Sequence, residues 1–497
     1  MNGHIRPRIH GKCELATNRD FSLKPPVCYQ GGKWFRMALS FEVPNEHDSA
    51  IKLNSDDPRM PLLRQQERQQ AKRLRKIRKG TRGKQHNWLL WWVKPSDSIE
   101  EFEDWLLSNL SSQVGILPES VYKVAIESLL NREIDIAPPT NGPFVWSIDE
   151  KHRIAALPEM GVIAFFAPPG NLRKAIDPKN LKTSWNWSFA GSPFSDKQEF
   201  VGTGEGFKRP DYVEKLHEKF GRGEKAVIGI LDSGIDPDCS ELEGRILATW
   251  AITDVPNSAP RPDYNRNTDE IGHGTETATI AAGTKHGIAD KAKIVSLKLP
   301  MRWDGSSYRY RLLDLVTAFS TLQSDAAPAI EGKPVLSLID TLLLPNGIRL
   351  SGRWRTDTNI ANIVDAVARF NSVHDVVVIA AIGNKAQSAS FPATEANVLS
   401  VGALDLDGKR WDNSGWSVGS TGQTIPVIHF PGCDIECLSL NGKAKRCTGT
   451  SMAAAGVAGV VALLAQKSPT SLGRWQIVRN NLAEDEDQFG PLPKFSI

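Results

Sequence analysis

From residue 226 onward, short and nearly continuous apolar runs alternate with segments of helical periodicity. The apolar runs, which predict buried strands, are 226–231, 293–299, 334–339, 375–383 and 398–404. The segments of helical periodicity are 275–283, 310–322, 359–370 and 451–466. Apolar strands separated by helices predict an α/β fold with a parallel sheet covered by helices on both faces. In such folds, functional side chains collect at the carboxyl ends of the strands.

The chain before this region has a different pattern. His86–Val93 and Gly161–Ala167 predict strands, and helical spacing predicts helices over 99–110, 120–130 and 149–157. We therefore expect a smaller α+β module over 85–169, followed by a connecting segment over 170–222. The remaining boundaries that we predict are an N-terminal region over 1–84, the α/β domain over 223–470 and a C-terminal tail over 471–497.

Length and composition fit this division into several parts. The chain has 497 residues, more than the roughly 250–300 at which a single hydrophobic core stops growing. Hydrophobic residues make up 40% and charged residues 24%, which excludes a chain that is disordered throughout.

The net charge of +3 conceals a basic arm, Arg59–Lys84. The basic arm holds eleven Lys or Arg and one acid, Glu67, so its net charge is +10 and the rest of the chain carries −7. Such a block is either a solvated linker or a contact site for nucleic acid or an acidic protein.

Neither a signal peptide nor a membrane span is expected. The first 24 residues are polar, and the most apolar run, Met452–Ala465, is shorter than the roughly 18 residues that cross a bilayer. We therefore expect a cytoplasmic protein with reduced cysteines. Cys433 and Cys437 lack the partners of a zinc site, so no metal or cofactor is expected.

Four residues carry candidate chemistry, and each has an ordinary structural explanation. Asp232 ends an apolar strand, and His273 opens a helix between two glycines. Ser451 opens another helix and could be only a cap, while Asn384 follows a buried strand. Taken together, an acid, a histidine and a serine in that order, with an amide donor, could perform nucleophilic catalysis.

At these residues the sequence resembles the subtilisin-like serine peptidases (subtilases, peptidase family S8). The resemblance extends over about 240 residues, 223–467, and is carried by ILDSGID, GHGT, AAIGN, SFPATEANVLSVGA and GTSMA. It implies that Ser451 is the nucleophile, His273 the general base and Asp232 the residue that orients the histidine. It also implies that Asn384 and the main-chain N–H of Ser451 form an oxyanion hole.

Some positions depart from the family pattern. Ala455-Gly456 stand where Pro-His is usual, and Glu276 stands where a second histidine is common. The edge strand that pairs with substrate was expected near Ser337–Thr341, which reads SLIDT instead of Ser-x-Gly. The acidic pairs Asp236/Asp238 and Asp269/Glu270 are explained equally well as solvated turns, so no calcium loop is assigned.

The resemblance implies a serine endopeptidase that binds protein or peptide substrates. Residues 85–169 resemble an inhibitory propeptide in position and size, although an unrelated docking domain fits equally well. We expect regulation by the N-terminal region or by a partner protein, because an unregulated cytoplasmic endopeptidase would be toxic. The alternative is a regulatory or partner-binding protein on a peptidase scaffold, with the basic arm contacting nucleic acid or an acidic partner.

Overall fold

The computed structural model divides the chain into two units, residues 1–52 and 53–497. It describes residues 27–30, 33–36, 88–92, 144–147, 153–157, 160, 162–166, 183–185, 188–190, 199–200, 209–252, 268–303, 308–323, 329–347, 358–418, 424–465, 467–468, 470–482, 485–487 and 490–492. In the first unit, β1 (Val27–Gln30) and β2 (Lys33–Arg36) form an antiparallel hairpin. The basic arm and the helices predicted over 99–110 and 120–130 lie outside the described residues.

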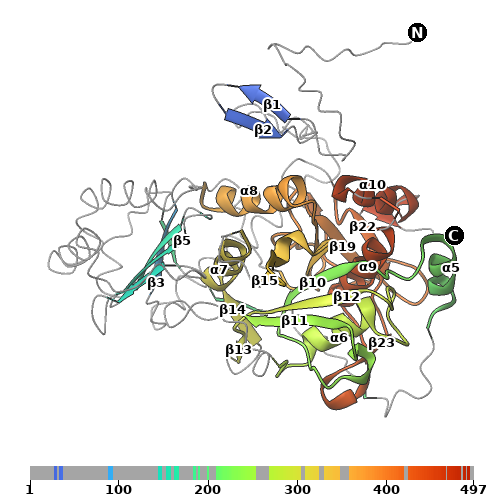
Figure 1. The fold of residues 1–497 in the computed structure, drawn as a ribbon. Helices are drawn as coiled ribbons and strands as arrows, with labels where there is room; N and C mark the ends of the chain where they lie inside the picture. The colour runs from blue at the N-terminus through green and yellow to red at the C-terminus, as the bar shows by residue number, and fades with distance from the viewer. Residues whose placement is uncertain are drawn as a thin grey trace, which may run out of the picture. The chain divides into compact units, whose positions relative to one another are not determined.

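The centre of the second unit is a seven-stranded parallel sheet in the order β11-β12-β10-β17-β18-β19-β22 (Figure 1). Its strands are β10 (Val227–Asp232), β11 (Ile246–Ala251), β12 (Lys293–Lys298), β17 (Thr341–Leu344), β18 (Val377–Ala381), β19 (Leu399–Leu404) and β22 (Ile428–Pro431). The predicted α/β fold with a parallel sheet is therefore confirmed.

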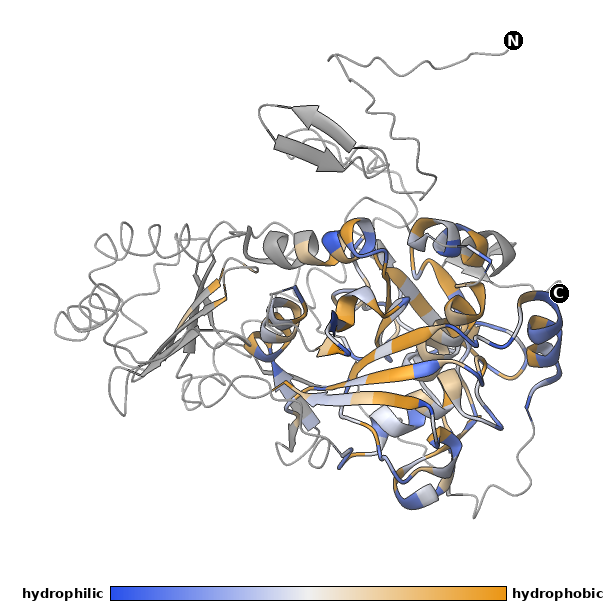
Figure 2. Ribbon diagram, viewed as in Figure 1, coloured by the Kyte–Doolittle hydropathy of each residue, from blue (hydrophilic) through white to orange (hydrophobic). Residues whose placement is uncertain are grey.

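Side chains that alternate along the strands enter two separate cores. Leu342 and Leu344 of β17 lie in one core, and Leu343 between them lies in the other. The central strands are accordingly mostly apolar, with polar residues chiefly toward their ends (Figure 2). This double burial explains why the strands read as continuous apolar runs in the sequence.

Helices cover both faces. The core on one face includes residues of α7 (Leu312–Gln323) and α8 (Thr358–Val373). The core on the other face includes residues of α5 (Asp211–Phe220), α6 (His273–Ala282), α9 (Thr450–Leu464) and α10 (Ser471–Leu482).

Helix α9 is buried along its whole length, and small residues make this possible. A Cβ on Gly459 would lie 2.8 Å from the carbonyl oxygen of Ala281 in α6, and one on Gly456 would lie 2.5 Å from the ring of Phe430. The Ala/Gly-rich sequence of α9 therefore allows the helix to pack closely between α6 and the sheet.

Before the α/β region, five strands form an antiparallel sheet in the order β4-β5-β6-β3-β7. They are β3 (Trp88–Trp92), β4 (Phe144–Ser147), β5 (Arg153–Leu157), β6 (Val162–Phe166) and β7 (Thr183–Trp185). The prediction of a helix over 149–157 is wrong, because residues Arg153–Leu157 form β5. Pro158 follows this strand, and a proline disfavours helical geometry in the residue before it.

A second correction concerns 334–339, which contains the 3₁₀ turn η4 (Val335–Ser337) instead of a strand. Pro334 precedes this turn, and an apolar run alone does not distinguish a strand from a buried turn or helix. The strand of this part of the chain is β17, which begins only at Thr341. The segment that follows β17, Pro345–Gly347, therefore lies beside Asp232 and Ser451.

The remaining elements are short. They are β8 (Ser188–Ala190), β9 (Glu199–Phe200), β13 (Arg302–Trp303), β14 (Tyr308–Arg311), β15 (Ala329–Ile330), β16 (Lys333–Pro334), β20 (Ser417–Val418), β21 (Thr424–Ile425), β23 (Ile435–Leu438), β24 (Ala444–Cys447), β25 (Asp485–Asp487), β26 (Gly490–Leu492) and the turns η3 (Ser240–Leu242) and η6 (Leu440–Gly442). Strand β8 pairs with β14, and β9 pairs with β24, so the connecting segment adds strands to the α/β region.

Candidate active site

Asp232 lies at the carboxyl end of β10 and is 1% exposed. One oxygen, Oδ1, accepts hydrogen bonds from the main-chain N–H of Ser233 at 2.7 Å and from Asn346 Nδ2 at 2.9 Å. The other, Oδ2, lies 2.7 Å from Nδ1 of His273 and accepts a 3.4 Å contact from the hydroxyl of Thr277. Donors on both oxygens compensate for the loss of water around this buried carboxylate.

His273 is the first residue of α6, and the glycines beside it allow close approach of a second segment. A Cβ on Gly274 would lie only 2.0 Å from the carbonyl oxygen of Gly234, two residues after Asp232. Gly272 has a φ of 99°, which favours glycine. These glycines bring the start of α6 against the loop that follows Asp232.

The environment of His273 favours its protonated form. Burial disfavours the charged ring, but the Asp232 carboxylate attracts the proton and accepts a hydrogen bond from the ring, and Glu276 and Asp269 add smaller attractions. Together these groups raise the pKa of His273 from 6.5 to about 9. The Asp232–His273 contact is therefore charge-assisted whenever the ring carries both protons.

Ser451 is the second residue of α9 and is 1% exposed. Its hydroxyl donates a 2.9 Å hydrogen bond to the carbonyl oxygen of Pro345, just beyond β17. The main-chain N–H of Ser451 belongs to the first turn, where an α-helix supplies no partner of its own. The positive end of the α9 dipole therefore lies at the serine.

Asn384 follows β18 in the sequence and lies beside the first turn of α9. Its Oδ1 accepts hydrogen bonds from the main-chain N–H and from the hydroxyl of Thr450, both at 2.8 Å. A Cβ on Gly449 would lie 3.1 Å from Asn384 Nδ2. The amide is thus held by its oxygen, with its nitrogen beside Gly449 and the first turn of α9.

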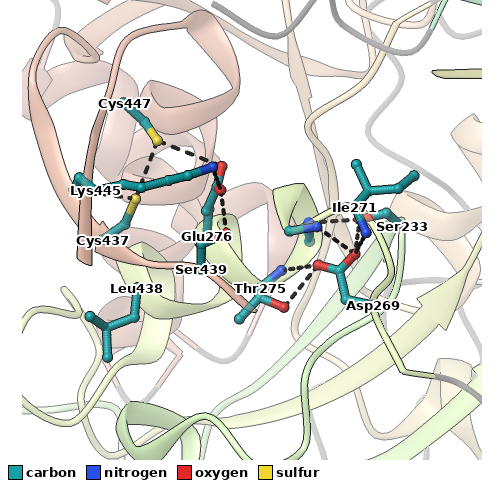
Figure 3. Close-up of polar contacts among 12 residues, drawn as sticks. Ser233, Asp269, Ile271, Thr275, Glu276, Cys437, Leu438, Ser439, Lys445 and Cys447 are labelled. Atoms are coloured by element: carbon teal, nitrogen blue, oxygen red, sulfur yellow. Dashed lines mark hydrogen bonds and ion pairs between the residues drawn. The ribbon is translucent and has the colours of Figure 1, made fainter. Parts of the chain in front are cut away.

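Asp269 connects the loop that follows Asp232 with the start of α6 (Figure 3). Its Oδ1 accepts a 2.8 Å hydrogen bond from the hydroxyl of Ser233 and two more from the main-chain N–H groups of Ile271 and Gly272. Its Oδ2 accepts hydrogen bonds from the main-chain N–H and the hydroxyl of Thr275. Asp269 is only 6% exposed, so its interpretation as part of a solvated turn is wrong. It fixes the loop after Asp232 to the start of α6.

Glu276, one helical turn after His273, is a member of a second buried cluster (Figure 3). Its Oε1 accepts hydrogen bonds from Lys445 Nζ at 2.6 Å and from the Ser439 hydroxyl at 2.7 Å. The thiol of Cys447 lies 3.6 Å from Oε2 and 3.5 Å from the sulfur of Cys437. This cluster ties α6 to β24, the strand that leads to Ser451.

The structure places the four sequence-predicted residues on elements whose ends converge. Asp232 and His273 are in direct contact. Asn384 accepts hydrogen bonds from Thr450, the residue before Ser451. The Ser451 hydroxyl donates to Pro345, and the next residue, Asn346, donates to Asp232. Sequence reasoning missed the donors Asn346 and Thr277. The rule that polar groups gather at strand ends would have found Asn346 if β17 had been placed correctly.

Three further observations concern the described residues alone. They contain no cluster of three or more His, Cys, Asp or Glu side chains suited to a metal ion. Within those same ranges, every helix is too short or too polar to cross a bilayer. Four cysteines whose side chains the structure describes are buried and free: Cys239, Cys433, Cys437 and Cys447.

The parallel sheet carries a buried Asp–His pair at a strand end and a serine at a helix start, which are groups that a serine hydrolase requires. The model of the subtilase family, peptidase family S8, matches residues 223–484, more than half of the chain. The chain therefore belongs to the subtilase family.

Curated relatives agree with this assignment. Subtilisin-like protease 2 of Pseudogymnoascus destructans is 32% identical over 246 residues, which is 49% of this chain and 52% of the relative. Subtilisin-like serine protease Pen c 1 of Penicillium citrinum is 32% identical over 257 residues, and PopC of Myxococcus xanthus is 28% identical over 268. These two matches cover 50% and 52% of this chain and 55% of each relative, so the chain spans about half the length of the relatives it matches.

Proposed function

We propose that the protein is a serine endopeptidase in which Asp232, His273 and Ser451 act as a catalytic triad. The observation that carries the proposal is the buried 2.7 Å contact between Asp232 Oδ2 and His273 Nδ1. This contact fixes the ring so that its other nitrogen, Nε2, is the one left to exchange a proton with a nucleophile. Membership in the subtilase family and the names of the relatives support the same function.

In the proposed reaction, the Ser451 hydroxyl turns from Pro345 toward His273, which takes its proton as Oγ attacks the peptide carbonyl. The main-chain N–H of Ser451 and Asn384 Nδ2 stabilise the oxyanion. Asp232 stabilises the imidazolium, which then protonates the departing amine and leaves an acyl group on Ser451. Water, deprotonated by His273, releases the acid product and restores the serine.

Labelling with a fluorophosphonate tests the proposal. We expect one probe per chain on Ser451, and no labelling of Ser451→Ala or of His273→Gln. Ser439, whose hydroxyl donates to Glu276, supplies a matched control, because Ser439→Ala should label normally. A folded wild-type protein that neither reacts with the probe nor cleaves a denatured protein would favour the alternative, a binding protein on a peptidase scaffold.

The proposal includes regulation by the part of the chain that precedes the α/β domain, here by the α+β module of residues 85–169. Four side chains are buried in the same core as α7: Leu157 of β5, Met160, and Val162 and Ala164 of β6. Gln323 at the end of α7 also donates to the sulfur of Met160 at 3.4 Å. These contacts support a role for this region as an internal inhibitor that packs against the α/β domain.

Mass spectrometry of purified full chains tests this part. If residues 85–169 are a propeptide, the wild type shortens by a cut between Gly170 and Gly223, whereas Ser451→Ala stays intact. In the intact Ser451→Ala chain, Met160→Asp should expose α7 to limited proteolysis. Equal chain lengths in the wild type and Ser451→Ala would reject self-processing.

We also propose a cytoplasmic location. The proposal rests on the sequence expectation of reduced cysteines, and the buried sulfurs of Cys437 and Cys447, 3.5 Å apart, offer a pair on which it can be tested. Alkylation of the denatured, unreduced protein from its native cells should modify all six cysteines. A disulfide found in that sample would reject a reducing compartment.

Contact of the basic arm with nucleic acid or an acidic protein remains a prediction from charge. Its eleven cations would make such binding strongly dependent on salt. Replacing these cations with glutamine should lower the salt concentration at which the full chain leaves a heparin column. Unchanged retention would reject the prediction.

A further inference from the structure

Asn346 lies at the point where the ends of β10 and β17 meet. These strands pair in parallel, with Ile230 opposite Leu343, so the residues just beyond β17 lie beside Asp232. The side chain of Asn346 is 5% exposed and extends to Asp232 from the segment just after β17. Neither the family motifs in the sequence nor the four predicted site residues include it.

The contact of Asn346 is with the oxygen of Asp232 that faces away from the histidine. Asn346 Nδ2 donates to Oδ1 at 2.9 Å, and the N–H of Ser233 donates to the same atom at 2.7 Å. Oδ2 is thereby left for His273. Two donors on one oxygen oppose rotation of the carboxylate about its Cβ–Cγ bond, whereas the Ser233 donor alone comes from the adjacent residue and constrains it less.

The residue before Asn346 contacts the nucleophile. The carbonyl oxygen of Pro345 accepts the hydrogen bond of the Ser451 hydroxyl at 2.9 Å. Two consecutive residues therefore contact the acid and the nucleophile, which are 219 positions apart in the sequence. The dipeptide Pro345-Asn346 therefore links Asp232 and Ser451 through two hydrogen bonds.

We propose that Asn346 is a positioning residue that holds the carboxylate of Asp232 in the orientation in which Oδ2 meets His273. The inference rests on the proposed peptidase function. It differs from a structural role, in which the amide would only satisfy its own buried hydrogen-bonding groups. A positioning role affects the proton affinity of His273 and the turnover of each active site, whereas a structural role affects only the fraction of folded protein.

The charged groups around His273 make the direction of the pH effect clear. Asp232 on β10, Glu276 on α6 and Asp269 before α6 act on the ring, and Lys445 on β24 is paired with Glu276. Asn346→Leu removes the donor but changes none of these charges. If the carboxylate then turns from His273, the pKa of the ring falls from about 9 toward its ordinary 6.5.

Kinetics of the full chain test the proposal. In Asn346→Leu, with concentrations set by fluorophosphonate titration, we expect kcat to fall by about 10- to 100-fold, the range for losing one hydrogen bond to a charged group. KM should change little, and the acid limb of kcat/KM should move to lower pH. An unchanged kcat per titrated site would overturn the proposal. So would an acid limb of kcat/KM whose midpoint keeps its pH or moves to higher pH.

Asn371→Leu is the matched control. Asn371 on α8 donates to the carbonyl of Asn397 and accepts from the N–H of Val378, so it bonds only main chain. Its loss should lower stability and leave the pH profile of each titrated site unchanged. If Asn346→Leu does not fold, Asn346→Ser, which leaves more space, is used for the same comparison.

A second readout does not depend on peptidase activity. In the Ser451→Ala chain labelled with ¹³C-histidine, the His273 resonance is assigned by its absence in His273→Gln and is titrated by NMR. Asn346→Leu should lower its midpoint. An unchanged midpoint rejects positioning by Asn346, whereas absence of fluorophosphonate labelling of the wild type rejects only the proposed function.

Discussion

Gly274 and Gly234 are in such close contact that a Cβ on Gly274 would lie 2.0 Å from the carbonyl oxygen of Gly234. One glycine follows His273 and the other lies two residues after Asp232. The contact between these two main-chain segments therefore determines how closely the histidine approaches the acid.

Gly274→Ala should separate these segments. Relief of the clash requires main-chain movement, and overpacking of this kind costs about 1–3 kcal/mol or more. We expect a lower urea midpoint and a large loss of fluorophosphonate labelling. Gly332→Ala is the control, because that position has a φ of 76° but open space, so labelling should persist.

Lys445→Met tests the buried ion pair with Glu276. Both side chains are at most 6% exposed, so the variant leaves a buried carboxylate without its cation, at a cost of about 3–5 kcal/mol. Urea unfolding should show this loss, and Glu276→Gln in the same chain should recover part of it. Arg446→Ala, which removes the more exposed pair with Glu436, should cost no more than about 1 kcal/mol.

The rate of peptide hydrolysis should rise with pH as His273 loses its proton. Burial lowers the affinity of the ring for a proton, but Asp232 raises it more, so the pKa is about 9 and the acid limb of kcat/KM should have its midpoint near that pH. Asp232→Asn should move this midpoint to lower pH and reduce kcat by about 10⁴. A wild-type midpoint near 6.5 would contradict the raised pKa of His273.

The same pKa predicts how stability depends on pH. The folded protein binds the His273 proton more tightly than the unfolded chain, whose histidine has a pKa near 6.5. The resulting stabilisation is complete below about pH 6.5 and is lost as the pH rises through 9. Denaturant unfolding at several pH values should show this decline, which His273→Gln should reduce.

Asn384→Ala should reduce kcat by about 10²–10³ and leave KM nearly unchanged, because the oxyanion exists only after attack. Thr450→Val removes one of the two bonds that Thr450 donates to Asn384 Oδ1 but keeps the bond from the main chain. Its effect on kcat should be smaller. Steady-state kinetics that show equal losses would contradict this ranking.

The sequence predicted the features that depend on neighbouring residues. Asp232 and Asn384 could be placed because each follows an apolar run of a doubly covered sheet. The apolar spacing of Arg153–Leu157 suits a helix as well as a strand, and Pro158 directly after it is the local signal against a helix. Lys445 and Asn346 could not be assigned, since their partners are 169 and 114 positions away and only the folded topology brings them together.

The burial of α9 has a consequence for biosynthesis. Ser451 opens a helix enclosed by α6 and by strands as distant in sequence as β10 and β22, so it reaches its final environment only when all of them are assembled. A ribosome must release residues through Leu464 before α9 can pack. Ser451 therefore reaches its buried environment late in synthesis, after the segments that form α6, β10 and β22 have left the ribosome.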